Sequence, residues 1–232
     1  MKKSPQRTAA LALLLVVPAP SIGVTLALLV PETVGSIGQA VWTASKVWLI
    51  VVPLLWLLLV DRKRISLSPM RHGGLGVGVL SGLVIAALII AAAAVFGPNM
   101  IDTNDAKEVA AGNGLDELGR YIGLAVVLSI GNALMEEYVW RWFVQSRWKV
   151  LTGSANAAIV LSAACFTIHH VLALSAYFHP SLVAIASFGV FVGGCLWSWL
   201  ATRYQSIWPG YVSHVLVDAG VFVAGGMILF GA

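Results

Sequence analysis

Long apolar stretches alternate with short polar segments along the whole chain. Each stretch has about the 20 residues that a helix needs to cross the hydrocarbon layer of a bilayer. The pattern predicts an all-α fold, a polytopic membrane bundle of about seven transmembrane helices, with a bend in the first helix at Pro18 and Pro20. The predicted helices cover residues 8–30, 41–60, 75–97, 121–146, 155–176, 182–201 and 209–231.

Composition strengthens the membrane interpretation. Of the 232 residues, 59% are hydrophobic and 10% are charged, whereas a soluble domain has about 25% charged residues. The net charge of +4 comes from basic residues spread over short loops, which does not indicate a nucleic-acid surface. Cys165 and Cys195 both fall in apolar stretches, so they do not indicate a disulfide framework.

Lysine and arginine are concentrated in alternate connections between the predicted helices. Ten of the fourteen fall before residue 8, at 61–71, at 147–149 or at 203, and only Lys107 and Arg120 fall in the other connections. Cytoplasmic loops of membrane proteins carry such an excess of positive charge. The asymmetry predicts an N-terminus inside and, after seven spans, a C-terminus outside.

The chain divides into two parts by the polar residues that it carries. Residues 1–120 contain three apolar helices and an acidic outer segment at 98–120. Gly74, Gly78 and Gly82 repeat at a four-residue spacing in the third helix, which favours close helix contact. Residues 121–232 carry most of the intramembrane charges, and we expect them to form the core that carries the function.

Two adjacent carboxylates and a guanidinium lie inside the fourth helix, at Glu136, Glu137 and Arg141. Each charge costs roughly 2.5–3.5 kcal/mol on insertion scales, so such groups usually face the bundle interior and have a partner or a function. Glu137 and Arg141 are four residues apart and share a helix face, so they can pair. Glu136 lies about 100° away around the helix. It is therefore the carboxylate left available for chemistry.

Two further helices present polar faces of the same kind. His214 and Asp218 are four residues apart on the seventh helix, and Phe166 and His170 have the same spacing on the fifth. Imidazoles facing a carboxylate can deprotonate a water molecule and stabilise a developing oxyanion. The neighbouring His169 should point away from the His170 face, so we expect it to be a packing or interfacial residue. Lys46, near the outer end of the second helix, should extend its ammonium to the interface.

The three elements Glu136-Glu137-x-x-x-Arg141, Phe166-x-x-x-His170 and His214-x-x-x-Asp218 resemble a known family over about residues 131–218. The family is that of the CAAX proteases and bacteriocin-processing (Abi, or type II CAAX prenyl endopeptidase) membrane proteins. Its motifs occur here in its own order, each on a separate apolar helix. No His-Glu-x-x-His element of a zinc peptidase is present.

The resemblance implies an intramembrane endopeptidase of the glutamic type. By motif position, Glu136 with His170 would activate water, and His214 with Asp218 would line the oxyanion side. Glu137, Arg141 and Phe166 would support the site. No cofactor is expected. The alternative is a zinc enzyme, whose ligands would be Glu136, His170 and His214, a set that suits zinc with an open water position.

The resemblance also bears on localisation and partners. We expect a multi-pass protein of a prokaryotic cytoplasmic (inner) membrane, with a cavity open toward the inner face. Its partners would be the lipid bilayer and a protein or peptide substrate, such as a C-terminal sorting signal or a lipidated tail. The alternatives are a non-enzymatic regulator or bacteriocin self-immunity protein and, less favoured without an inverted repeat, a proton-coupled transporter.

Overall fold

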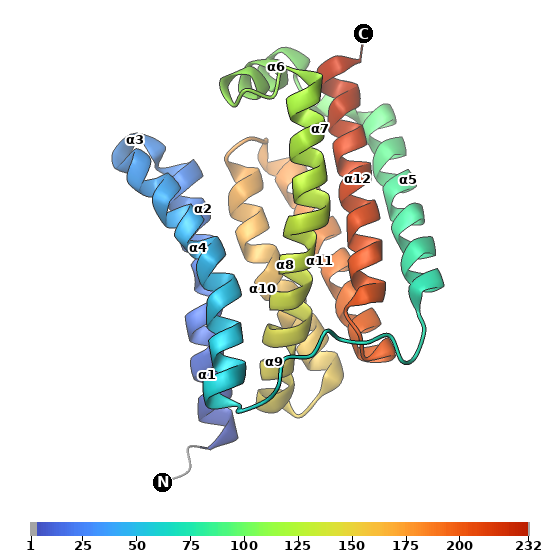
Figure 1. Cartoon of the computed structure of the whole chain (residues 1–232). Coiled ribbons are helices and arrows are strands. Elements are labelled where there is room, and N and C mark those ends of the chain that lie inside the picture. Colours follow the sequence, from blue (N-terminus) through green and yellow to red (C-terminus); the bar gives the residue numbers. More distant parts are fainter. Residues whose placement is uncertain (1–3, 232) are drawn as a thin grey trace.

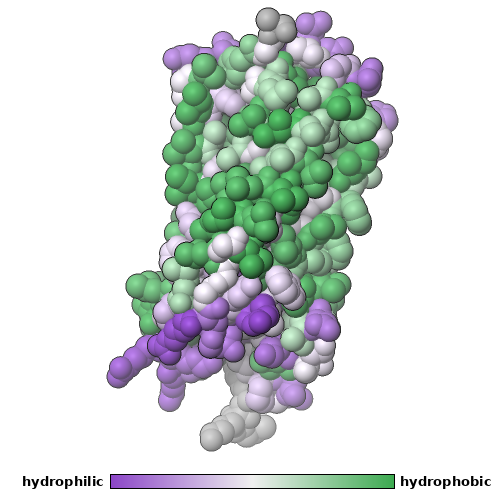
Figure 2. All heavy atoms as spheres, turned by 90° about the vertical axis from the view of Figure 1, so that its right-hand side faces the viewer, coloured by the Kyte–Doolittle hydropathy of each residue, from purple (hydrophilic) through white to green (hydrophobic). Residues whose placement is uncertain are grey.

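The computed structural model describes residues 4–231, which form a bundle of helices joined by short connections (Figure 1). A broad hydrophobic belt lies between two hydrophilic ends (Figure 2). Seven helical spans are long and apolar enough to cross a membrane, so the predicted seven-helix architecture is confirmed and the chain is a multi-pass membrane protein. The spans are Pro5–Leu29, Ser36–Val60, Leu75–Met100, Leu118–Thr152, Ala155–Ser175, Pro180–Tyr204 and Trp208–Phe230.

The first two spans form a pair of interrupted helices. Proline at position 18 has no backbone N–H, so the first span breaks there, as predicted. Toward α3 this pair diverges from the rest of the bundle (Figure 1). The pair comprises α1 (Pro5–Val16), α2 (Pro18–Val24) and η1 (Thr25–Leu29), then α3 (Pro31–Val34), α4 (Ser36–Leu55) and η2 (Trp56–Val60).

Helix α5 (Leu75–Met100) packs closely along α12 (Trp208–Phe230). A Cβ atom at Gly82 would lie 2.9 Å from the Cα of Ser213, and one at Gly78 would collide with the carbonyl group of Pro209. Glycine at these positions therefore lets the two backbones touch. The predicted small-residue face is confirmed, and it holds α12 in place at the level of Ser213, next to a residue of the predicted site.

The fourth span alternates between α-helical and π-helical segments. Short π-helical turns inside α-helices occur frequently at functional sites. The span extends to Thr152, where Gly153 at φ +69° ends it, so the predicted end near residue 146 is wrong. Its segments are α7 (Leu118–Val126), η3 (Val127–Asn132), α8 (Ala133–Glu136), η4 (Glu137–Val144) and α9 (Gln145–Thr152).

The remaining helices complete the bundle around the fourth span. Helix α10 (Ala155–Ser175) starts at Ser154, whose side chain accepts a hydrogen bond from the N–H of Ala157, and it packs against α11 (Pro180–Tyr204). Helix α6 (Thr103–Gly112) lies in the predicted acidic outer segment, across the end of the bundle near the C-terminus (Figure 1).

The basic connection between the second and third spans is fastened to the turn before α12. The hydroxyl of Ser206 donates to the carbonyl of Ser68 over 2.8 Å, and the indole N–H of Trp208 donates to the carbonyl of Leu67 over 2.9 Å. Arg147 of α9 pairs with Asp61 at the end of η2. These contacts fasten the end of the second span to the fourth span, and the connection that follows it to the start of α12.

Candidate active site

The intramembrane polar residues meet where the fourth span, α10 and α12 come together. Glu136 ends α8 and Glu137 begins η4, while two histidines come from α10 and His214 from α12. Glu136 is 5% exposed, Glu137 is fully buried and His214 is 3% exposed. Because each group needs a partner at this burial, their mutual contacts define the site.

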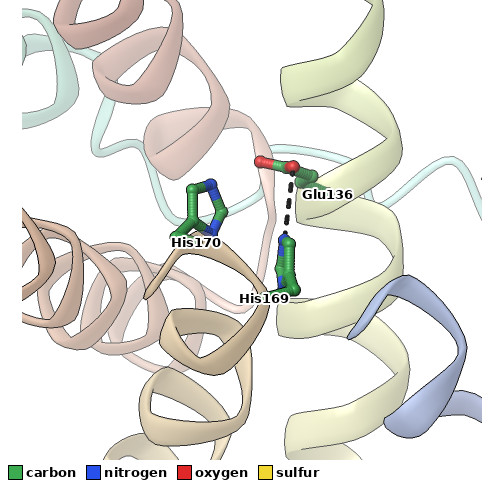
Figure 3. A group of neighbouring side chains, drawn as sticks. All are labelled: Glu136, His169 and His170. Carbon is green, nitrogen blue, oxygen red and sulfur yellow. Dashed lines mark ion pairs between the residues drawn. The ribbon is translucent and has the colours of Figure 1, made fainter. Parts of the chain in front are cut away.

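Glu136 lies between imidazoles from two helices. Its Oε1 atom is 4.0 Å from Nε2 of His169, and its Oε2 atom is 3.6 Å from Nε2 of His214. The ring of His170 lies beside the same carboxylate (Figure 3). Glu136 is thus free of the arginine, as the helix geometry predicted, and faces the groups expected for chemistry.

His214 is hydrogen-bonded at one ring nitrogen and has two carboxylates near the other. Its Nδ1 atom lies 3.1 Å from Oε1 of Glu137, and because a carboxylate only accepts, Nδ1 carries the proton. Its Nε2 atom faces Glu136 and lies 3.7 Å from Oδ1 of Asp218. The ring also stacks on Trp197, with the centroids 3.8 Å apart. The ring is therefore fixed with Nε2 toward the Glu136 carboxylate.

The predicted Glu137–Arg141 pair is confirmed. Nε of Arg141 lies 3.4 Å from Oε1 of Glu137, and the two side chains are 1% and 0% exposed. The guanidinium also lies over the rings of Phe166 and Trp197, 4.5 Å and 5.0 Å from their centroids. Cation–π contacts of this kind stabilise a charge that is removed from water. Phe166, the first residue of its motif, thus packs against the arginine while its helix carries the histidines.

A glycine makes room for this buried carboxylate. A Cβ atom at Gly210 would lie 2.8 Å from Oε2 of Glu137 and 3.4 Å from the carbonyl oxygen of Trp197. Gly210 lies in the first turn of α12, four residues before His214. The absence of a side chain there lets Glu137 reach the histidine.

His169 lies at the site, so the prediction of a packing residue turned away from His170 is wrong. The two imidazole centroids are 4.2 Å apart, and the His169 side chain is 11% exposed. The His169 ring stacks on Trp140 at 5.4 Å, which aims Nε2 at Glu136. His170 has its Nδ1 atom 3.0 Å from the carbonyl of Phe166. The side chains of adjacent helical residues point about 100° apart, but both rings can face a carboxylate that lies between their two directions.

The histidines and Glu136 lie at matching heights along their helices. Glu136 is 16 residues before the end of α9 at Thr152, and His170 is 15 residues after the start of α10 at Ala155. If the fourth helix ended near residue 146, as the sequence predicts, Glu136 would lie closer to that face of the membrane than His170 does. His214 is only six residues from the start of α12, but α12 begins further along the bundle than the α9–α10 turn does (Figure 1).

The sequence prediction missed Lys46 as a residue of the site. Its ammonium donates to Oδ1 of Asn132 over 2.7 Å, so it does not extend to the interface. Asn132 is one helical turn from Glu136. The sequence predicts that this helix starts at residue 41 and so places Lys46 near its end, whereas α4 begins at Ser36 and the charge lies ten residues inside it, where it is as costly as the charges in the motifs.

A pocket reaches the Glu136 carboxylate from the side of the first two spans. It includes Lys46, His169 and Glu136, and apolar side chains such as Trp42 and Val24 complete its wall. These lining residues of the first two spans lie toward the connection with α3, at the end opposite the basic connection 61–74. The pocket therefore does not lie where a cavity is expected from the sequence, which is on the side of the basic connections, the predicted inner side.

Three donor atoms at the site also fit a metal ion. One ligand atom each from Glu136, His169 and His170 lies within 4.8 Å of the other two. Zinc takes such a nitrogen and oxygen set, and the Phe166 carbonyl at His170 is a typical partner of a metal-bound histidine. This set contains His169 in place of the His214 expected from the sequence.

The geometry therefore defines a membrane-embedded site built from carboxylates and imidazoles, of the kind that hydrolytic enzymes use. Residues 119–220 match a family model described as "Type II CAAX prenyl endopeptidase Rce1-like", which confirms the resemblance. The match covers nearly all of the fourth span, α10, α11 and the first part of α12, and it includes every residue of the three motifs. It supports an intramembrane protease. No curated protein and no solved structure matches the chain.

Proposed function

We propose that the protein is an intramembrane endopeptidase in which Glu136 activates a water molecule to cleave a peptide bond of a membrane-associated protein or peptide. The observation that carries the proposal is the position of Glu136, buried between imidazoles of α10 and α12 inside the segment that matches a protease family. A buried carboxylate surrounded by imidazoles but not paired with the available arginine is suited to move a proton.

The chemical step follows from these groups. Water adds to the carbonyl carbon of the scissile bond while a Glu136 oxygen accepts one of its protons. The tetrahedral intermediate then collapses, the carbon–nitrogen bond breaks, and the proton held by Glu136 passes to the leaving amine. His169 and His170, which flank the same carboxylate, orient the water and Glu136.

His214 acts on the oxygen of the carbonyl that is attacked, and Asp218 donates to the same oxygen only when its carboxyl group is protonated. Since Nδ1 of His214 is occupied by Glu137, Nε2 is the atom that donates to the oxyanion, and it does so only when the ring carries both protons. The Glu137 carboxylate compensates the resulting positive charge. Preorganised donors of this kind contribute strongly to catalysis in sites that exclude water.

Zinc chemistry is the second candidate mechanism, favoured by the cluster of three donor atoms. Glu136, His169 and His170 would hold the ion, which would supply Lewis-acid polarisation of a bound water. In that case Glu137 would still orient His214, and the oxyanion side of the site would be unchanged.

The wider setting belongs to the same proposal. The substrates of the protein are membrane-associated proteins or peptides, including C-terminal sorting signals and lipidated tails. The protein acts in a prokaryotic cytoplasmic membrane, with its N-terminus inside. A non-enzymatic regulator or immunity protein has no use for the Glu136–histidine arrangement.

Cleavage in isotopically labelled water tests the proposal. Membranes of a host that lacks the gene would be incubated with purified protein in H₂¹⁸O, and new peptide termini would be identified by mass spectrometry. We expect termini carrying one ¹⁸O with the wild-type protein and with Glu117→Gln, an exposed control. We expect none with Glu136→Gln at equal protein level. Labelled termini that persist in Glu136→Gln would reject Glu136 as the base, and their absence with the wild type would reject the peptidase.

A further inference from the structure

Trp197 of α11 contacts two consecutive residues of α12. Its indole N–H donates to Oγ of Ser213 over 3.2 Å, and its ring stacks on His214 with the two ring planes 15° apart. Trp197 is 4% exposed and Ser213 is fully buried. One side chain of α11 thus touches both a residue of the proposed site and the neighbour of that residue.

The hydrogen bond between His214 and Glu137 does not by itself fix the plane of the imidazole. The χ2 torsion of histidine has a broad energy well, so a ring that is held only at Nδ1 can still tilt about that contact. A tilt would move Nε2, the atom proposed to donate to the oxyanion, because it lies on the other side of the ring from Glu137. The stacked indole face restricts the tilt, since the imidazole can turn only by losing its contact with Trp197.

The indole is itself held by a chain of hydroxyl groups that ends on α5. Ser81 donates to the carbonyl oxygen of Gly78 over 3.0 Å, and its oxygen lies 3.1 Å from Oγ of Ser213. Because a hydroxyl group has a single proton to donate, Ser81 accepts at the second contact and Ser213 donates. The oxygen of Ser213 then accepts from Trp197, whose indole nitrogen can only donate. The donors of this chain therefore all point in one direction, from α11 through α12 to α5.

We propose that Trp197 is a positioning residue that sets the plane of the His214 ring, and this inference rests on the proposed function. Ser213 and Ser81 act through Trp197, because they fix the indole. The close approach of α5 to α12 brings Ser81 within reach of Ser213. Helix α5 lies outside the segment that matches the family, so it supplies the site with a contact that none of the three motifs contains.

Nuclear magnetic resonance of the histidine rings tests the inference without relying on activity. The protein would carry isotope labels only on its five histidines, and the His214 signals would be assigned by their loss in His214→Gln. Protons of a ring stacked on an indole face resonate upfield. Ser81→Ala alters neither ring, but it should move the His214 ring protons downfield or broaden them, because the loosened indole leaves the stack.

The matched control is a serine of α11. Ser187 is buried, and its hydroxyl has no hydrogen-bond partner among residues 4–231. Ser187→Ala should therefore leave the His214 signals unchanged. His214 signals that also stay in place in Ser81→Ala would overturn the assignment.

Kinetics on a substrate identified by ¹⁸O labelling complete the test. Ser213→Ala should lower kcat by about 10–100-fold with KM unchanged, because a misplacement of about 1 Å can cost about 10²-fold in rate. Trp197→Phe keeps an aromatic ring but removes the N–H donor, so it should have a similar effect, and adding Ser213→Ala to it should cause no further loss. Losses that multiply in the double variant would overturn the assignment. Displaced His214 signals in Ser81→Ala, together with a wild type that produces no labelled termini, would instead overturn the proposed function and leave the role of Trp197 in orienting the ring standing.

Discussion

Oε1 of Glu137 lies 3.1 Å from Nδ1 of His214 and 3.4 Å from Nε of Arg141. One carboxylate oxygen of Glu137 thus joins α12 to the fourth span, because it accepts a hydrogen bond from the ring N–H of His214 and forms an ion pair with the Arg141 guanidinium. The two adjacent glutamates have different tasks because of this contact. Glu137 orients a histidine, and Glu136 remains available to the reacting groups.

Glu137→Gln should lower kcat by about 10–100-fold, the range seen when a group that orients a functional histidine is removed. The amide can still accept from Nδ1, but it carries no charge to compensate a doubly protonated His214. KM should change little, because Glu137 is fully buried and away from the lining of the pocket. Steady-state kinetics on a substrate identified by ¹⁸O labelling provide the measurement. An unchanged kcat would mean that the charge of Glu137 serves only Arg141.

Arg141→Ala should destabilise the protein by about 3–5 kcal/mol, because it leaves Glu137 buried without its cationic partner. Arg120→Ala is the matched control, since Arg120 and its carboxylate partner Glu117 are 65% and 64% exposed and the remaining charge stays in water. Thermal unfolding in detergent should show a clearly larger fall in melting temperature for Arg141→Ala. Equal shifts for the two variants would contradict the assignment of Arg141 as the buried partner.

Gly210→Ala should impair activity more than stability. The new methyl group would stand 2.8 Å from Oε2 of Glu137 and displace the carboxylate from His214. The control is Gly189→Ala on α11, where a Cβ atom meets open space. Activity and melting temperature measured together decide the matter. A Gly210→Ala protein with normal activity would show that the contact between Glu137 and His214 is dispensable.

His169 and His170 should both be required, although only His170 belongs to the motif. Both rings offer a nitrogen to the Glu136 carboxylate, so His169→Ala and His170→Ala should each reduce cleavage by about 10²–10⁴-fold, the usual contribution of acid–base groups. The exposed His72→Ala should leave activity unchanged. Full activity in His169→Ala would mean that His169 has only the packing role expected from its helix face.

The sequence predicts the number of spans and the three polar faces, because hydrophobic runs and the cost of intramembrane charge are local properties. The Glu137–Arg141 pair follows from helix periodicity in the same way. The positions of Lys46 and His169 do not follow from it. Lys46 meets Asn132 across 86 positions of the chain, and the direction of His169 depends on its stacking on Trp140. Both positions depend on how separate helices pack against each other, which cannot be predicted from the sequence of any one helix.

The contact between Glu137 and His214 has the same origin. The sequence places Asp218 one turn from His214 on the same helix, so Asp218 is the acid that helix periodicity alone brings to the ring. In the structure Glu137 reaches Nδ1 from the fourth span, because Gly210 leaves space for it. The end of the fourth helix was misplaced for a different reason. Arg147 and Lys149 suggested an interface, whereas Arg147 is paired with Asp61 and the helix continues to Gly153.

The last prediction concerns metal. If Glu136 activates water directly, purified protein should retain activity after exhaustive chelation and should contain no stoichiometric zinc. The contacts of His214 do not distinguish the two mechanisms, because its Nδ1 proton is held by Glu137 and its Nε2 atom faces two carboxylates in either case. The donor cluster of Glu136, His169 and His170 favours the zinc mechanism. Elemental analysis of active protein separates them. One zinc per chain, lost together with activity in the His169→Ala variant and restored to the wild type by adding zinc after chelation, would replace the glutamate mechanism with a zinc mechanism on the same residues.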